Sequence, residues 1–282
     1  DPTVTLEAEV ISPDNFADLS HDEICASTVY HGKRQLRLDD FFDVDGERSD
    51  AIEIRGNLHR VRHVGRGMSR GALTVHGDIG MHLGAHMSGG KIEVFGSAGD
   101  WVGGHVGKSF AYGAQRGLFL IQGDADARAG IRLSGADMVI GGTPGQAIDD
   151  KLGTLGARAN CKGFAFEYMT GGRAVVLGDP GPWLCSGMTG GVVYVRQNDE
   201  MGLDERAIRR RLSKAAKVSL DELLDPDIAN VRELLSAYQS ALRESGQDNA
   251  ARAVTELIED PAANFIAINP VTQQADPSIS TE

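Results

Sequence analysis

Short apolar runs recur through the middle of the chain, and a glycine follows each of them. The runs Leu73–Val75 and Val175–Leu177 are too short for a helix and rich in β-branched residues, which predicts β-strands. Glycine suits corners that need a positive φ angle or a close approach of two backbones. The glycines that end such runs are Gly77, Gly96, Gly123 and Gly178, and Gly84, Gly103 and Gly130 follow seven residues after the first three.

These runs belong to an internal repeat. Residues 72–90 and 173–191 are each 19 residues long and align without a gap, and partial copies cover 52–71, 91–106 and 118–136. A repeat this short cannot bury its apolar face alone, so its copies must stack. Stacked copies would pair their strands in parallel at about 4.8 Å. We therefore predict an all-β solenoid, a single-stranded right-handed parallel β-helix with inward-pointing Met68, Met87 and Met188.

Two other repeat folds fit the spacing less well. A β-propeller needs repeats of about 40 residues with four strands each, roughly twice the length found here. A leucine-rich horseshoe needs an L-x-x-L-x-L spacing, which the sequence lacks.

The two ends of the chain do not carry the repeat. Residues 1–50 predict an N-terminal capping segment, in which Asp14–Cys25 contains a short helix with Ser20 as its N-cap and Glu23 three residues later. The parallel β-helix itself is assigned to residues 51–196. Residues 197–282 lose glycine and gain helix formers, which predicts a C-terminal helical extension and tail.

Local signals divide this extension into elements. Ser219 and Glu222 form a capping-box pattern, and Asp225 with Pro226 predicts the start of an amphipathic helix that Gly246 ends. A second helix is expected over about residues 249–258. The apolar stretch Phe265–Ile268 predicts a short strand that docks on a partner, followed by a polar tail.

Composition narrows the function classes. The 282 residues carry a net charge of −12, which argues against nucleic-acid binding, and the one basic run, Arg206–Lys217, is interpreted as a solvated helix face. No stretch approaches the ~18 apolar residues of a membrane span, so no membrane association is expected. Cys25, Cys161 and Cys185 form neither a zinc pattern nor an even set, which favours reduced thiols in a cytoplasmic protein.

Candidate catalytic residues are mostly explained by turns. His82 and His86 lie four apart, but in a strand-and-turn repeat they share no helical face, and the other repeat histidines are scattered (His59, His63, His76 and His105). The acids near the strand-ending glycines suit turns, because a carboxylate accepts from nearby backbone N–H groups. Those acids are Asp78, Asp100, Asp124, Asp126 and Asp179.

Glycine pairs give no nucleotide motif. Gly103–Gly104 and Gly141–Gly142 neither follow a strand nor open a helix, as phosphate-binding loops do. Cys185 replaces a corner glycine, with a reactive thiol as the weaker interpretation. We therefore assign no catalytic, cofactor-binding or metal-binding residue to this chain.

Longer motifs carry a resemblance to two related families. Glu167–Gly172, Val175–Gly178 and Gly187–Gly191 resemble the C-terminal GXGXG β-helix domain of the glutamate synthase large subunit. The first half is instead similar to the C subunit of formylmethanofuran dehydrogenase, which shares that domain. The segments that carry this second similarity are Glu9–Asp14, Tyr30–Gly32, Leu38–Phe42 and Met87–Ile92.

The resemblance implies a structural subunit of a multi-subunit oxidoreductase or amidotransferase complex. Its partners would be an amidotransferase with a flavin-dependent synthase, or amidohydrolase-like and molybdopterin subunits. Flavin, iron–sulfur or molybdopterin and tungstopterin cofactors would then belong to the partner subunits, with none bound by this chain. The chain departs from the glutamate synthase pattern at Cys161–Phe166 and in an insertion over Thr143–Ala159.

Two further functions stay open. Carboxylates on adjacent turns, such as Asp78, Asp100 and Asp124, could form a catalytic site on one face of the solenoid, as in carbohydrate-active β-helices. The chain could also self-assemble into a filament, although a helical tail over one side or end argues against open polymerisation.

Overall fold

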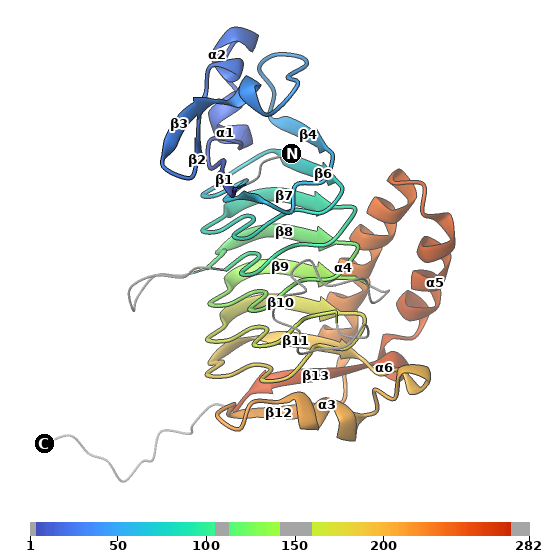
Figure 1. Cartoon of the computed structure of the whole chain (residues 1–282). Coiled ribbons are helices and arrows are strands. Elements are labelled where there is room, and N and C mark those ends of the chain that lie inside the picture. The colour runs from blue at the N-terminus through green and yellow to red at the C-terminus, as the bar shows by residue number, and fades with distance from the viewer. Residues whose placement is uncertain (1–3, 105–112, 142–159, 272–282) are drawn as a thin grey trace, which may run out of the picture.

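The computed structural model describes residues 4–104, 113–141 and 160–271 of the chain. Most of these residues form a stack of chain turns, and each turn adds a parallel strand to one long sheet (Figure 1). A smaller sheet lies at the N-terminal end of the stack, and two long helices run along one side of the stack (Figure 1). The molecule is therefore elongated, with the two edges of its large sheet at opposite ends.

The parallel strands follow one another in space as they do in sequence. Leu73 of one strand lies beside Ile92 of the next, and Ala98 bridges in parallel to Ala125 one turn later, so turns contact each other at two places. The predicted strands are present, although the second ends at Val176. These strands are β4 (Ala51–Arg55), β6 (Ala72–His76), β7 (Ser88–Val94), β8 (Arg116–Ile121), β9 (Ser134–Ile140), β10 (Thr170–Val176) and β11 (Gly190–Arg196).

The N-terminal segment folds into a small mixed sheet over the first turn. The capping box of Ser20 and Glu23 is confirmed, but it begins a helix of only five residues, and a separate short helix precedes it. Strand β1 pairs antiparallel with β2 and parallel with β5, which belongs to the first turn of the stack. The elements are β1 (Leu6–Glu7), α1 (Pro13–Phe16), α2 (His21–Cys25), β2 (Thr28–His31), β3 (Arg34–Arg37), η1 (Leu38–Asp40) and β5 (Val61–Arg62).

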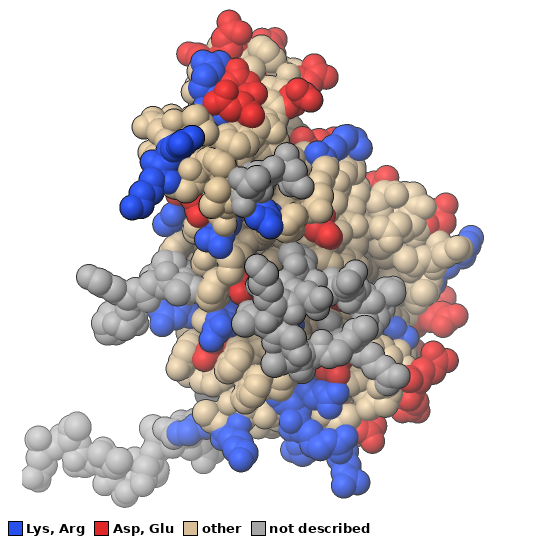
Figure 2. Space-filling model, viewed as in Figure 1, with Lys and Arg blue, Asp and Glu red and all other residues tan. Residues whose placement is uncertain are grey.

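Two antiparallel strands extend the C-terminal end of the large sheet, and β12 is its last strand. Strand β13 (Phe265–Pro270) pairs with β11, and β12 (Val218–Asp221) pairs with β13. The predicted strand at Phe265–Ile268 is confirmed, and it docks on this chain's own sheet. Between β11 and β12 lie η3 (Asp199–Met201) and α3 (Glu205–Arg211), and Figure 2 shows Lys and Arg side chains gathered at this lower end.

The helices that follow lie against the outer face of the sheet. They are α4 (Asp225–Glu244), α5 (Asp248–Glu259) and α6 (Pro261–Asn264), and Gly246 ends α4 with a φ of 76°. The capping box expected at Ser219 is wrong, because Ser219 lies in β12 and its hydroxyl donates to Asp221. Pairing of β12 with β13 overrides that local signal. Within the described ranges, no helix is long and apolar enough to span a membrane.

The predicted fold class is wrong. The chain is not an all-β, single-stranded parallel β-helix, because it contains two sheets that mix parallel and antiparallel strands, with helices packed against the larger one. The repeat predicts only the parallel strands of the stacked turns, because the antiparallel strands and the helices lie outside it. The domain boundaries at residues 50/51 and 196/197 stay a prediction.

Alternate residues of the later strands enter two different cores. In β8, Phe119 and Ile121 point into the stack, while Leu120 points outward and packs with Val139, Val175 and the apolar face of α4. All of these side chains are almost fully buried. Burying each one stabilises the fold by about 1.5–3 kcal/mol. The helix α4 therefore forms a second layer that packs on the large sheet.

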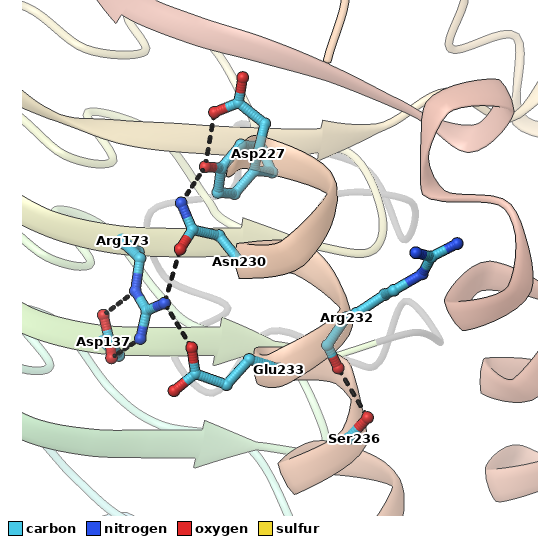
Figure 3. A network of polar contacts seen from close by, with 8 residues as sticks. Asp137, Arg173, Asp227, Asn230, Arg232, Glu233 and Ser236 are labelled. Carbon is cyan, nitrogen blue, oxygen red and sulfur yellow. Dashed lines mark hydrogen bonds and ion pairs between the residues drawn. The ribbon is translucent and has the colours of Figure 1, made fainter. Parts of the chain in front are cut away.

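A polar network fastens α4 to the sheet (Figure 3). The Arg173 guanidinium of β10 donates to both carboxylate oxygens of Asp137 on β9, at 2.9 and 2.6 Å. It also donates to Asn230 and Glu233 of α4 at 2.8 and 2.7 Å. The Asn230 amide in turn donates to the Tyr194 hydroxyl at 3.0 Å. Burial raises the pKa of Tyr194, so the hydroxyl stays protonated and able to donate.

Candidate interaction surface

Each turn of the stack has a corner in which alternate residues have a positive φ. In the first turn these are His63, Gly65 and Gly67, with φ between 63° and 69°. A left-handed conformation costs a non-glycine residue about 1–2 kcal/mol relative to the right-handed one. The matching positions of later turns are His82, Gly84 and His86; Trp101 and Gly103; Arg128, Gly130 and Arg132; Phe164, Phe166 and Tyr168; and Trp183, Cys185 and Gly187.

The middle position of each corner faces the interior. A Cβ on Gly84 would lie within 2.8 Å of Ile92 and would overlap the Phe119 ring, so only glycine fits there. Where the chain has another residue at this position, as in Phe166 and Cys185, the side chain is completely buried. The space that the neighbouring apolar side chains leave inside the stack therefore determines whether the middle position of a corner must be glycine.

The first position of each corner faces outward, and its side chains form a continuous column. The rings of His63 and His82 stack at 4.6 Å, and His82 stacks on Trp101 at 4.9 Å. The Arg128 guanidinium lies 5.8 Å from the Trp101 ring centroid, and it lies 4.9 Å from the next ring of the column. That ring is Phe164, which stacks on Trp183 at 4.6 Å, so the stacked column consists of His63, His82, Trp101, Arg128, Phe164 and Trp183.

Stacking offsets much of the backbone strain in this column. An aromatic pair contributes about 0.5–1.5 kcal/mol beyond its buried area, which approaches the cost of one left-handed residue. Burial lowers the pKa of His63, although the Glu7 carboxylate opposes the shift, so this ring is neutral near pH 7. The column is therefore a rigid surface feature with a defined geometry.

The C-terminal part of the column exposes large aromatic side chains. Trp183 is 50% exposed, and Tyr168 at the third corner position is 49% exposed. The Arg132 guanidinium lies over the Tyr168 ring at 5.9 Å. Trp, Tyr and Arg are the residues that most often carry the binding energy of protein interfaces. The candidate interaction surface is therefore the C-terminal end of the stacked column, at Trp183, together with Tyr168 and Arg132.

The repeat acids lie apart from this surface and join successive turns. The Asp78 carboxylate accepts from the Ser97 N–H at 2.8 Å, and Asp100 accepts from Ala127 N–H, also at 2.8 Å. Asp124 accepts from the Asn160 amide at 2.6 Å. Each of these bonds reaches the following turn and so links two turns of the stack, whereas the sequence predicted bonds to backbone N–H groups close by within one turn.

The remaining two repeat acids are paired with cations. Asp126 lies 3.3 Å from the Lys162 ammonium, and both side chains are almost completely buried. Asp179 accepts two hydrogen bonds from the Arg211 guanidinium, which ties α3 to the stack. The interpretation of the basic run Arg206–Lys217 as a solvated helix face therefore does not hold for Arg211, which is paired with Asp179. Among the residues that the structure describes, no cluster of His, Cys, Asp and Glu could hold a metal ion.

The histidines singled out from the sequence do not converge. His63 and His82 belong to the stacked column, while the ring of His76 lies edge-on to Phe95 at 4.6 Å. His59 contacts the Asn57 amide oxygen at 2.9 Å. His105 and the insertion at Thr143–Ala159 lie outside the described residues.

Two of the three cysteines are expected to be unreactive in the folded protein. Burial raises the pKa of the Cys161 and Cys185 thiols, and Asp124 and Asp179 raise that of Cys161 further. Cys25 is partly exposed. We predict that iodoacetamide at pH 7.5 modifies one thiol per native chain and three after denaturation, counted by intact mass. Rapid native modification of Cys161 or Cys185 would contradict this.

The stacked column was not predicted, although the sequence contains a signal for it. His63, His82 and Trp101 are separated by 19 residues each, and so are Phe164 and Trp183. A spacing equal to the repeat places side chains directly above one another. Assigning the corners to glycine hides this spacing, because it leaves His63 and His82 as scattered histidines and gives Trp101, Phe164 and Trp183 no role.

Comparison with known proteins agrees with this corner geometry. Residues 156–271 match the family model described as "GXGXG motif", and the match includes the corners at Phe164–Tyr168 and Trp183–Gly187. Residues 156–271 therefore resemble a GXGXG domain, which confirms the resemblance expected from the sequence.

Curated proteins similar to this chain include C subunits of formylmethanofuran dehydrogenase. The chain is 40% identical over 85 residues to the C subunit of the tungsten-containing enzyme 2 of Methanothermobacter wolfeii, which covers 28% of this chain and 32% of the relative. The C subunit of the molybdenum-containing enzyme 1 of Methanosarcina barkeri is 36% identical over 83 residues, which is 28% of each chain. The matches thus span about a third or less of these relatives.

A solved structure shares the fold. A chain of the formyltransferase/hydrolase complex FhcABCD from Methylorubrum extorquens, solved with methylofuran, is 24% identical, with a TM-score of 0.56. The match covers 90% of this chain and 88% of that chain. The stacked turns, the N-terminal segment and the helices together therefore have a known architectural counterpart.

Proposed function

We propose that this chain is a non-catalytic structural subunit of a multi-subunit enzyme complex of the formylmethanofuran dehydrogenase type. Its role is to hold the catalytic subunits together. The observation that carries the proposal is the stacked column, a row of side chains that ends in the exposed Trp183, together with the exposed Tyr168 at the third position of the corner before it. The similarity to formylmethanofuran dehydrogenase sequences and to a chain of the FhcABCD complex supports the same conclusion.

The proposed partners are the catalytic subunits of that complex, of the hydrolase, formyltransferase or molybdopterin and tungstopterin class. Flavin, iron–sulfur or pterin cofactors then belong to those subunits. Co-expression of the chain with these subunits from the same genome tests the proposal. We expect a stable complex with turnover, and no formyl transfer or hydrolysis by the purified chain alone. Activity of the isolated chain, or a failure to associate, would refute the structural role.

Removing the exposed rings should weaken assembly without unfolding the chain. Trp183 and Tyr168 have φ values of 58° and 55°, so glycine at either position relieves backbone strain. We expect Trp183→Gly combined with Tyr168→Gly to weaken association at least tenfold by biolayer interferometry. Tyr30→Gly is the control, because Tyr30 is 44% exposed but lies on the N-terminal sheet. Equal effects from both would argue against the stacked column as the interface.

A carboxylate site on the stack is the alternative function, and one set of variants separates the two. Asp78→Asn, Asp100→Asn and Asp124→Asn each remove a charge from a bond between turns. The structural role predicts a lower melting temperature with unchanged specific activity of the assembled complex. Loss of activity at unchanged stability and assembly would instead favour catalysis by these carboxylates.

A further inference from the structure

The two ends of the large sheet differ in their last strands. At the C-terminal end two antiparallel strands follow the stack, because β13 pairs with β11 and β12 pairs with β13, which makes β12 the last strand there. At the N-terminal end β4 is the last strand of the sheet. An open strand edge presents hydrogen-bonding groups to any extended chain that reaches it.

The hydrogen-bond pattern identifies the groups at that edge. Ala72 N–H donates to the Asp50 carbonyl, and Gly56 N–H donates to the His76 carbonyl. Alternate residues of a parallel strand bond to the same neighbour, so Ala51, Glu53 and Arg55 direct their N–H and C=O groups away from β6. The Ser49 hydroxyl accepts from Ala51 N–H and donates to its carbonyl. The open edge therefore consists of Glu53 and Arg55.

An apolar groove lies beside this edge. It has a volume of about 1000 Å³ and lies between the N-terminal segment and the first turn. Phe41, Phe42, Val44 and Ile52 line it and are only partly buried, while the floor is buried. The floor consists of Leu6, Ile11, Phe16, Ile24, Leu38, Ile54, Leu58 and Val61. The groove is large enough to accept several apolar side chains.

The rim of the groove is acidic. Asp43, Asp45 and Glu47 line it and are exposed. None of the three makes an ion pair with a described residue, whereas Glu53 pairs with Arg55 at 2.6 Å. Figure 2 shows acidic side chains at this upper end of the molecule. An occupant with Lys or Arg side chains would complement this rim.

We propose that β4 receives an extended segment of a partner subunit, which adds a strand at Glu53 and Arg55. This inference rests on the proposed function, because it concerns the assembled complex. Main-chain hydrogen bonds to the open edge align the segment, and its apolar side chains enter the groove. Its Lys or Arg side chains lie against Asp43, Asp45 and Glu47. The partner's strand thus completes an edge that the chain leaves open.

Hydrogen exchange in the complex tests the strand addition directly. We expect the Glu53 and Arg55 amides to exchange at least tenfold more slowly in the complex than in the isolated chain, while α3 amides serve as the internal reference. Unchanged exchange within an intact complex would overturn the inference and leave the structural role standing. Equal protection in the isolated chain would show that the chain covers its own edge. Absence of any complex would overturn both proposals.

Proline at an edge position separates pairing from folding. Glu53→Pro removes an N–H that faces away from β6, so the fold should tolerate it, while strand addition is blocked. Glu53→Gln keeps the N–H and is the control for the lost charge. We expect Glu53→Pro to weaken association at least tenfold, with a melting temperature within a few degrees of wild type. If Glu53→Pro is destabilised, exchange at Arg55 in the Glu53→Gln complex decides the question.

Neutralising the rim tests the predicted charge of the partner segment. We expect the triple change Asp43→Asn, Asp45→Asn and Glu47→Gln to weaken association at 50 mM salt and to reduce its dependence on salt. The matched control is the triple change Asp22→Asn, Glu200→Gln and Glu205→Gln, which alters the net charge by the same amount at other sites. Stronger association after rim neutralisation would contradict a basic segment.

Discussion

The change Gly77→Ala is expected to destabilise the protein by about 3–5 kcal/mol, whereas Gly56→Ala should cost about 1–2 kcal/mol. The two glycines end strands on successive turns and have similar φ values of 144° and 129°. A Cβ on Gly77 would overlap the carbonyl oxygen of Gly56, whereas nothing lies within 4 Å of a Cβ on Gly56. Backbone strain is common to both, so the difference isolates the packing of one turn on another.

Urea unfolding monitored by circular dichroism measures this difference, provided that both variants keep the wild-type m-value. The overlap involves backbone, which cannot rotate away as a side-chain end can. The turns would have to separate, and the hydrogen bond from Gly56 N–H to the His76 carbonyl holds them together. Equal losses of stability for the two variants would show that the turns are less closely stacked than the structure indicates.

The change Val175→Asn should destabilise the protein by about 3–5 kcal/mol, and Thr74→Asn should cost less than about 1 kcal/mol. Both residues point outward from the large sheet at comparable places in their strands. Val175 is completely buried beneath α4, whereas Thr74 is partly exposed between Glu53 and Glu93. Asparagine at Val175 therefore loses apolar contacts and buries an amide without a partner.

Thermal and urea unfolding measure both variants, and the α4 contact can be checked separately. Val175→Asn should speed hydrogen exchange in α4, because the helix loses part of the surface that holds it. Thr74→Asn should leave α4 unchanged. If both variants retain wild-type stability, then α4 does not depend on apolar burial against the sheet.

The sequence contains a signal for which strands α4 covers, although this cover was not predicted. Strands with one solvated face alternate, as in Ile52–Ile54, where Glu53 is the exposed middle residue. Strands that bury both faces are continuously apolar, as in Met138–Ile140 and Ala174–Val176. The change between these two patterns marks where the helix begins to cover the sheet. A continuous apolar run alone does not say whether a helix or another subunit supplies the cover.

The sequence by itself determined the stacked turns and the local ends of several elements. A 19-residue repeat cannot bury its apolar residues without a neighbouring copy, and the Ser20–Glu23 capping box bonds within one short segment. Such features depend on local geometry or on identical neighbours, so a pattern in one dimension suffices. The placing of the repeat acids in turns was readable from the sequence too, whereas the bond from Ser97 N–H to Asp78 depends on the stacking of two turns.

Only the tertiary structure decided which strands end the large sheet and which side chains lie on its surface. Strand β13 follows β11 by almost seventy residues of sequence, and its antiparallel pairing with β12 overrides the helix signal at Ser219. The column from His63 to Trp183 exists because strained backbone holds unlike side chains in one line, which no propensity predicts. Pairing and stacking between distant residues depend on the whole fold, and the same dependence leaves β4 open at the other end.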